Sequence, residues 1–175
     1  MDNLDNMNLR LRPYTNADES AARSAHMVAL SEGSHMLLGF DDDTTWDDFL
    51  NSIDDQRAGL RHSTYVVRGV QLAADVNGEI VERSSIRFEL NDFFASQGGH
   101  IGYYVRPEYR RLGYASEILR QALIIARSEG VGPVLMYCSD LNIGSSKAIE
   151  RNGGLLDETG LSVDDQLTWR RYWIP

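Results

Sequence analysis

The segment at 105–115, VRPEYRRLGYA, combines the residue types that bind an anion at the start of a helix. The first turn of a helix has backbone N–H groups without acceptors and a partial positive charge, so it can hold a diphosphate. Gly113 and the small Ala115 allow the backbone to approach that anion closely. Arg110 and Arg111 add positive charge at the same point. Taken alone, the segment fits a simple turn before a helix equally well.

A second segment, at 140–154, has a related composition. Asn142 and the small polar residues Ser145 and Ser146 open a short helix, which a Gly-Gly pair ends. A strand is expected between the two segments. The two segments therefore lie on either side of one strand.

These segments carry a resemblance to a known family. The spacing Arg110-x-x-Gly113-x-Ala115 resembles the acyl-CoA signature of the GNAT superfamily of N-acetyltransferases, and 140–154 resembles that family's second coenzyme segment. Residues 86–103 and the ending 170–174 are similar to a bacterial GNAT subgroup of predicted acetyltransferases.

The resemblance implies a fold of the α/β (α+β) class. A central, mostly antiparallel, twisted sheet would be flanked by helices on both faces, with strands 101–105 and 134–138 splayed apart. Acetyl-CoA would insert between these strands as the co-substrate. The implied coenzyme-binding residues are Tyr104, Val105, Arg110, Arg111, Leu112, Gly113, Tyr114, Ala115, Asn142, Ser145 and Ser146.

The same resemblance implies that backbone N–H groups near Tyr104 and Val105 stabilise the oxyanion that forms when an amine attacks a thioester. Ile149 stands where many family members carry a tyrosine that protonates the leaving thiolate. The proton donor is therefore open, with Tyr103, Ser145 and water as the options.

A general base is needed because the attacking amine must be neutral. Glu89 is one candidate, and a salt bridge to Arg87 is its equally good structural role. His100 has a suitable ordinary pKa, although a structural hydrogen bond near the Gly-rich loop at 97–99 is favoured slightly. Cys138 lies near the expected site, but a core role is favoured over an acyl-enzyme.

Residues 24–56 contain no Lys or Arg and many Asp and Glu residues. In the family, the first two helices and their connection form a wall of the acceptor pocket. This wall either attracts a polycationic acceptor or is an ordinary solvated surface, and the two interpretations stand equal. The acceptor-binding candidates are His35, Asp41, Asp43, Trp46 and Arg87.

The surrounding elements follow from local patterns. We expect a strand at 9–12, helices from 15 to 30 and from 44 onward, and a hairpin at Asn77-Gly78 joining strands 64–75 and 80–90. A helix at 115–128, a strand at 134–138, a helix at 145–152 and a hairpin of 155–158 with 167–173 complete the order. We expect one domain over 1–175, with 1–7 as a candidate disordered segment.

Composition excludes several other classes. The 175 residues carry 17 Lys and Arg against 26 Asp and Glu, and this net charge of −9 argues against nucleic-acid binding. Cys138 is the single cysteine, so no intrachain disulfide forms. The four histidines lack metal-ligand spacing, so we expect no metal. No apolar run approaches the roughly 20 residues that span a membrane, and the start lacks signal-peptide features, so we expect a cytoplasmic protein.

The sequence therefore predicts acetyl transfer from acetyl-CoA to a primary amine of a cationic small molecule, with an aminoglycoside-type antibiotic as the sharpest choice and antibiotic resistance as the consequence. Polyamines and protein or peptide N-termini are alternative acceptors. A non-catalytic acyl-CoA-binding sensor is the alternative of a different class. A homodimer through strands near the C-terminus is open.

Overall fold

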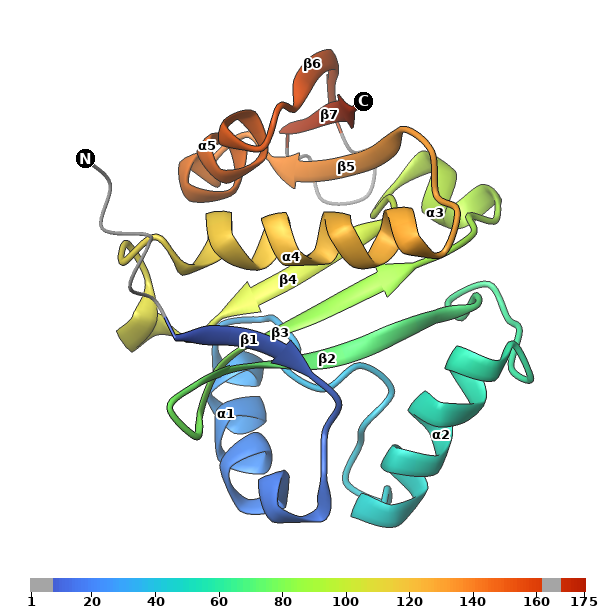
Figure 1. Cartoon of the computed structure of the whole chain (residues 1–175), viewed down its shortest axis with the longest axis vertical. Coiled ribbons are helices and arrows are strands. Elements are labelled where there is room, and N and C mark those ends of the chain that lie inside the picture. The colour runs from blue at the N-terminus through green and yellow to red at the C-terminus, as the bar shows by residue number, and fades with distance from the viewer. Residues whose placement is uncertain (1–7, 162–167) are drawn as a thin grey trace.

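A computed structural model describes residues 8–161 and 168–175. The candidate disordered segment 1–7, and the first residue of the strand expected at 167–173, lie outside these described residues. Two antiparallel sheets form the frame of the molecule (Figure 1). The first has the order β1-β2-β3-β4, from Leu9–Arg12, Gly69–Val76, Glu79–Arg87 and Ile101–Val105. The second has the order β5-β7-β6, from Val134–Ser139, Thr168–Ile174 and Leu155–Leu161.

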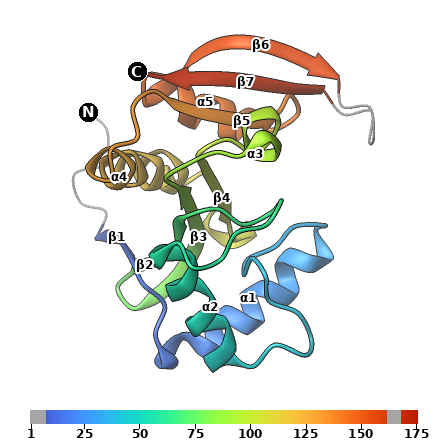
Figure 2. The same cartoon turned by 90° about the vertical axis from the view of Figure 1, so that its right-hand side faces the viewer.

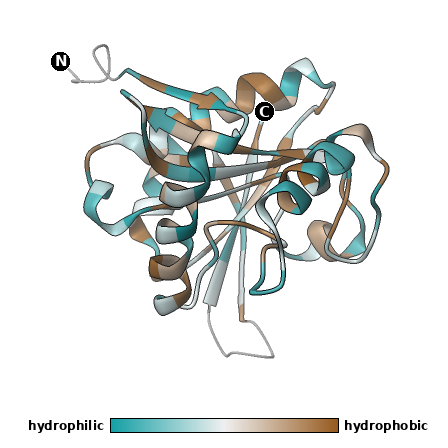
Figure 3. Cartoon of the chain, turned by 90° about the horizontal axis from the view of Figure 1, so that it is seen from below, coloured by the Kyte–Doolittle hydropathy of each residue, from teal (hydrophilic) through white to brown (hydrophobic). Residues whose placement is uncertain are grey.

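Helices cover both faces of the first sheet (Figure 2). One face carries α1 and α2, while α4 crosses the other face and α5 lies against the second sheet. The helices have hydrophilic and hydrophobic stretches in alternation (Figure 3), as expected when one side of each helix is buried. Their bounds are Glu19–Ser31 for α1, Trp46–Ala58 for α2, Asp92–Ser96 for α3, Tyr114–Ser128 for α4 and Ile143–Arg151 for α5, with 3-10 turns η2 at Asn16–Asp18 and η3 at Pro107–Tyr109.

The Asn77-Gly78 hairpin is confirmed. Both residues have positive φ, 54° and 91°, as a two-residue turn between twisted strands requires. Its strands are shorter than expected, since β2 begins at Gly69 and β3 ends at Arg87. A Cβ on Gly69 would lie 2.3 Å from the Ile86 carbonyl oxygen, so the two backbones approach too closely there for any other residue.

The expected continuation of β3 to residue 90 is wrong, because Asn91 starts a helix instead. Its side-chain oxygen accepts a hydrogen bond from Phe94 N at 3.0 Å and caps α3, an element that the sequence patterns did not predict. Glu89 was expected within that strand and instead lies beyond the end of β3.

The two sheets meet where β4 begins. Gly99 and Met136 form an isolated bridge, and His100 N donates to Leu135 O at 2.8 Å. His100 Nδ1 accepts from Leu135 N at 2.9 Å. Further along β4, the strand pairs with β3 on one side alone, within the part of the chain that the structure describes. The expected splay between β4 and β5 is present and starts at a glycine.

Two hydrophobic layers lie on either side of the first sheet. Under α4 and α5, Leu119, Ile149 and Tyr172 are fully buried. Under α1 and α2, Phe49 packs against Trp46, whose side chain is 4% exposed and whose Nε1 donates to Thr15 O. These layers fix β3 and β4 between the helices and so determine which side chains reach the gap between the sheets.

Candidate functional site

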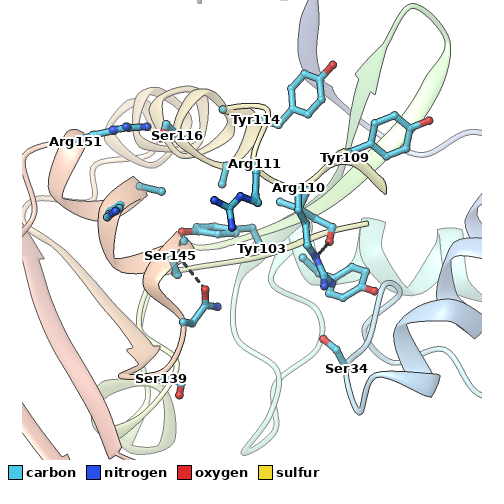
Figure 4. Close-up of a pocket in the computed structure, with 18 of the residues that line it drawn as sticks. Ser34, Tyr103, Tyr109, Arg110, Arg111, Tyr114, Ser116, Ser139, Ser145 and Arg151 are labelled. Carbon is cyan, nitrogen blue, oxygen red and sulfur yellow. Dashed lines mark hydrogen bonds between the residues drawn. The ribbon is translucent and has the colours of Figure 1, made fainter. Parts of the chain in front are cut away.

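A cavity of about 760 Å³ lies between the splayed strands and extends to the start of α4 (Figure 4). It has walls from the end of α1, from β4 and the turn after it, from the first turn of α4, and from α5. Its lining residues are Glu32, Ser34, Tyr103, Tyr104, Val105, Tyr109, Arg110, Arg111, Gly113, Tyr114, Ala115, Ser116, Ser139, Leu141, Asn142, Gly144, Ser145, Lys147, Ala148 and Arg151. Two of the predicted coenzyme residues, Leu112 and Ser146, are absent from this lining.

The turn before α4 presents a row of free N–H groups. Gly113 has φ 90° and Arg111 has φ 65°, both in the left-handed region. Within the described residues, no backbone or side-chain acceptor takes the N–H of residues 111–115, and the first N–H of α4 with a partner is that of Ser116. Consecutive amides pointing outward at a helix start form a cradle for an anion. This part of the cavity fits a diphosphate.

Three cationic side chains line the cavity with this cradle. Arg111 comes from the turn, while Lys147 and Arg151 are four residues apart on α5 and so share one helix face. Among the ion pairs of the described residues, none involves these three. The sequence analysis missed Lys147 and Arg151, although their spacing behind the Asn142 cap was a usable signal.

Arg110 has a different position from the one expected of it. Its guanidinium forms hydrogen bonds of 3.0 and 2.6 Å with the Glu32 carboxylate, and its Nε donates to Val105 O. Tyr104 also donates to Glu32, at 2.5 Å. The bonds from Arg110 and Tyr104 lower the pKa of Glu32, while burial and the Glu32 contact raise the pKa of Tyr104 to about 12. Arg110 thus joins the turn to the end of α1.

A hydroxyl pair faces the middle of the cavity. Tyr103 Oη and Ser145 Oγ are 2.9 Å apart, and Ser145 N is held by the Asn142 side chain at 3.0 Å. Figure 4 shows Tyr103 and Ser145 directed toward each other across the gap between β4 and α5. Burial raises the pKa of Tyr103, so the phenol keeps its proton at neutral pH. The pair can donate a proton to a basic atom placed between the strands.

The edge of β4 that faces the gap carries unpaired backbone groups. Alternate residues of a strand direct their N–H groups to opposite sides. The bonds from Arg87 N to His100 O and from Arg106 N to Val81 O make the even-numbered residues of β4 the ones that bond to β3, so Val105 presents its N–H to the gap. With the anion cradle and the hydroxyl pair, this gives one cavity an anion site, a donor for an oxyanion and a proton source.

Comparisons with known proteins identify the same architecture. The family model described as "Acetyltransferase (GNAT) family" matches residues 22–153, more than half of the chain. The chain belongs to the GNAT acetyltransferase family. It is an acetyl-CoA-dependent N-acetyltransferase of mixed α/β fold. Among curated proteins, none matches the sequence.

Solved structures with the GNAT fold resemble this chain at low identity. RimJ from Mycobacterium smegmatis, in complex with CoA-disulfide, is 16% identical with a TM-score of 0.71, over 95% of this chain and 81% of its own. The protein yncA from Salmonella typhimurium, with acetyl-CoA, is 15% identical with a TM-score of 0.65, over 95% and 92%. An acetyltransferase from Agrobacterium tumefaciens is 22% identical with a TM-score of 0.61, over 94% and 90%. At this identity the likeness is one of fold.

Ile149, the position of the tyrosine in many GNAT proteins, is fully buried in the core and outside the cavity lining. A Cβ on Gly154 would lie 2.3 Å from Ile149 Cγ2, so the side chain is closely packed. Cys138 is also in the core, 9% exposed, and burial raises the pKa of its thiol. In this GNAT chain the lining offers the bonded hydroxyls of Tyr103 and Ser145 in place of a side chain at position 149.

The two candidate bases lie away from the cavity. Glu89 borders a separate hollow with His62, whose Nδ1 is 3.6 Å from Glu89 Oε1. His100 Nδ1 is already an acceptor at the junction of β4 and β5, and burial lowers the pKa of His100. Neither residue is brought to the GNAT cavity.

The acceptor candidates separate into groups. Trp46 belongs to the core, while Asp41 and Asp43 are exposed and bonded within their own loop, where Asp41 accepts from Thr44 Oγ1 and from Asp43 N. These residues are not in the cavity lining. His35 and Arg87 are also absent from the cavity lining: the His35 carbonyl accepts from Arg83 Nη2 at 2.8 Å, and Arg87 donates to Gly99 O at 2.9 Å.

Metal and membrane sites are absent from the part of the chain that the structure describes. No group of three or more His, Cys, Asp or Glu side chains there could hold a metal ion. Among the described helices, none is long and apolar enough to cross a membrane.

Proposed function

We propose that this GNAT protein transfers the acetyl group of acetyl-CoA to the primary amine of a small molecule, with both substrates bound in one complex. The observation that carries the proposal is the continuity of one cavity, from the free amides at 111–115 to the hydroxyl pair of Tyr103 and Ser145. That continuity supports a bound thioester whose diphosphate and reactive carbonyl lie at its two ends.

The coenzyme roles follow from this arrangement. The amides at 111–115 bind the diphosphate, while Arg111, Lys147 and Arg151 neutralise further phosphate charge. The pantetheine part extends along the unpaired edge of β4. There the N–H of Val105 stabilises the oxyanion that forms as the amine attacks.

Proton transfer is assigned to the hydroxyl pair. When the carbon–sulfur bond breaks, the thiolate takes a proton from Tyr103, which recovers one through Ser145 and solvent. Glu32 is the carboxylate of the lining, and its lowered pKa keeps it ionised, so it attracts an ammonium group more readily than it acts as a base. The amine enters as the free base or loses its proton to water in the cavity.

The acceptor predicted from the sequence, an aminoglycoside-type cation, retains one line of support. The acidic surface that includes Asp41 and Asp43, together with the net charge of −9, attracts cations over a distance. Polyamines and peptide N-termini would share that attraction, and antibiotic resistance would follow only for the first class. The non-catalytic alternative, an acyl-CoA sensor, rests on Ile149, which cannot donate a proton to the leaving thiolate. The hydroxyl pair argues against this alternative because it offers another proton donor.

The test combines binding with turnover. Calorimetry with acetyl-CoA is expected to show binding, and an assay of released CoA thiol with mass detection is expected to show acetylation within a panel of aminoglycosides, polyamines, peptides and amino acids. Binding without acetylation of any amine would favour the sensor. No binding would reject the whole proposal.

The hydroxyl pair is tested by Tyr103→Phe, for which we expect kcat to fall about a hundredfold while acetyl-CoA affinity stays within about twofold. Tyr137→Phe is the matched control, since Tyr137 donates to Ala95 O outside the cavity and its loss should leave kcat unchanged. Equal kcat for the Tyr103→Phe variant and the unmodified protein would remove Tyr103 from the mechanism.

A further inference from the structure

Two arginines lie on one face of β3 without a carboxylate ion pair, Arg83 buried and Arg87 partly buried. Arg83 is 7% exposed, and its side chain shares a face of the sheet with that of Arg87 because strand residues alternate. A Cβ placed on Gly102 of β4 would lie 3.7 Å from Arg83 Nη1 and 3.9 Å from Arg87 Nη1. Both guanidinium groups therefore lie near Gly102, on the face of the sheet that carries α1 and α2.

The partners of these arginines are neutral. Arg83 donates to His35 O at 2.8 Å and to Ser85 Oγ at 3.2 Å, while its Nε is buried without any partner in the described chain. Arg87 donates to Gly99 O at 2.9 Å and lies 4.0 Å over the Phe94 ring. Among the ion pairs of the described residues, none involves either arginine.

The nearest acidic residue does not compensate these charges. Glu82 precedes Arg83, but the register pairs it with Ala74 and Val105 on the opposite face, below α4. Neither of its carboxyl oxygens has a hydrogen-bond partner among the described residues, and burial raises its pKa well above the ordinary value. Two buried cations close together cost free energy unless an anion binds to them. Burial, and then the charge of Arg83, lower the pKa of Arg87 to about 10.

The arginine pair adjoins the reaction cavity. Arg83 is the cross-strand neighbour of Tyr104, which lines the cavity, and Gly102 directly precedes Tyr103. Segment 32–35 separates the two regions, with Glu32 and Ser34 in the cavity lining and the His35 carbonyl on Arg83. A ligand that replaced the His35 and Gly99 carbonyls would place its anion on the arginines and its remaining atoms toward the gap.

We propose that Arg83 and Arg87 bind an anionic group of the acceptor, so that the acceptor is an amine that also carries a carboxylate, of the amino-acid class. A guanidinium offers a planar fork of donors that matches a carboxylate, and Arg83 has one such donor free. The inference rests on the proposed acetyl transfer. It differs from the proposal of a cationic acceptor because the arginines would select a negatively charged group on the acceptor.

The first experiment compares L-amino acids with their carboxamides as acceptors, one pair at a time. We expect kcat/KM to be about ten- to a hundredfold higher for each accepted acid than for its amide. The comparison is biased toward the amide, because its amine is less basic and a larger fraction of it is unprotonated. A higher kcat/KM for the acid would therefore reflect recognition of the carboxylate. Equal rates for acid and amide, or turnover of aminoglycosides and polyamines alone, would overturn the inference while leaving the acetyltransferase function intact.

The second experiment uses Arg87→Met, which keeps a long apolar stem over Phe94. We expect KM for the carboxylate acceptor to rise about ten- to a hundredfold, kcat to change little, and the amide to be unaffected. Arg68→Met is the matched control, because Arg68 also lies over a ring, that of Phe88, but is paired with Glu129 at the surface. A KM increase that is equal for acid and amide would indicate a structural role only and contradict the inference.

A third measurement does not depend on turnover. With CoA in excess, N-acetyl-L-amino acids should raise the melting temperature of the protein more than their amides do, and Arg87→Met or Arg83→Lys should remove the difference. Binding of acetyl-CoA is measured separately, so a failure of the coenzyme proposal and a failure of the anion proposal give distinct results. Equal stabilisation by acid and amide would overturn the assignment of Arg83 and Arg87.

Discussion

Both the backbone conformation of the turn and the binding of an anion favour a glycine at position 113. Its φ of 90° is unfavourable for any residue with a Cβ, and its amide lies in the cradle at 111–115. We expect Gly113→Ala to cost about 1–2 kcal/mol of stability from the backbone alone. We also expect it to lower acetyl-CoA affinity about ten- to a hundredfold, because one or two charged hydrogen bonds are lost. Calorimetry and thermal unfolding measure the two effects.

Gly130→Ala serves as the control for that change. Gly130 follows α4 and has φ +84°, and a Cβ at this position would have no atom within 4 Å, so the strain is similar and the cavity is distant. The variant should lose stability and keep its coenzyme affinity. If both variants lost affinity equally, the effect would be one of stability, and the cradle would not hold the diphosphate.

Lys147 and Arg151 give a second prediction at this scale. Replacing both by Gln should weaken acetyl-CoA binding and also reduce the dependence of its affinity on salt, because fewer phosphate charges are then neutralised by the protein. Isothermal titration at several salt concentrations measures both quantities. Arg57→Gln on α2 is an exposed change of charge outside the cavity, and it should alter neither. An unchanged salt dependence in the double variant would place the phosphates elsewhere.

Among the elements, β4 and β5 are joined at one end only, and Gly99 determines that junction. A Cβ on Gly99 would lie 2.3 Å from the Leu135 carbonyl oxygen, in addition to the strain of φ +62°. Gly33 has a similar φ, +68°, with nothing within 4 Å. We expect Gly99→Ala to destabilise the protein by about 1–3 kcal/mol more than Gly33→Ala, as measured by denaturant unfolding. Equal losses would show that the strands adjust to each other without cost.

Elements whose signals are local were predicted well from the sequence. The Asn77-Gly78 turn and the helices that begin after Asn142 and Gly113 depend on neighbouring residues, and each is present. The short α3 was missed because its cap, Asn91, directly follows residues that were expected to form a strand. A pattern of residue types does not show where a strand ends. The end of the β2–β3 pairing lies at Gly69, where the two backbones come close together, and that approach is a property of the folded chain.

The positions expected for the site residues likewise agreed with the structure where the signal was local and differed where it depended on distant contacts. The turn at Gly113 and the hydroxyls of Tyr103 and Ser145 follow from position in a motif, and the structure places them at one cavity. Trp46 was misplaced because an aromatic residue at the start of an amphipathic helix can turn toward solvent or toward the core, and only packing against Phe49 decides. The pairing of Arg110 with Glu32 depends on residues far apart in the chain, so no local pattern contains it.

At the scale of the whole molecule, stability depends on pH through Glu82. Its pKa is raised by burial, so the folded protein keeps a proton that the unfolded chain releases. The stability associated with the protonated group is fully present below about pH 4.5, the ordinary pKa, and is lost as the pH rises toward the pKa of the folded state. We expect Glu82→Gln, which cannot ionise, to lose less stability over that range.

Melting temperatures of both proteins between pH 5 and pH 8 provide the check on Glu82, where we expect the advantage of the Gln variant to grow with pH. Glu79→Gln, an exposed change on the same strand, should give an advantage that does not grow in this way. A constant difference between Glu82→Gln and the unmodified protein would mean that Glu82 ionises alike in the folded and unfolded states.

The contact between Arg110 and Glu32 connects the last turn of α1 to the phosphate end of the cavity. If a phosphate also bonded to Arg110, the guanidinium would have fewer donors left for Glu32, and coenzyme and carboxylate would compete for it. By thermodynamic linkage, the free energy that the end of α1 contributes to coenzyme binding equals the change in the stability of that helix end when the coenzyme binds. Ser34 and His35 follow directly, so a coenzyme that drew Arg110 away from Glu32 would also loosen the segment between the cavity and the arginine pair.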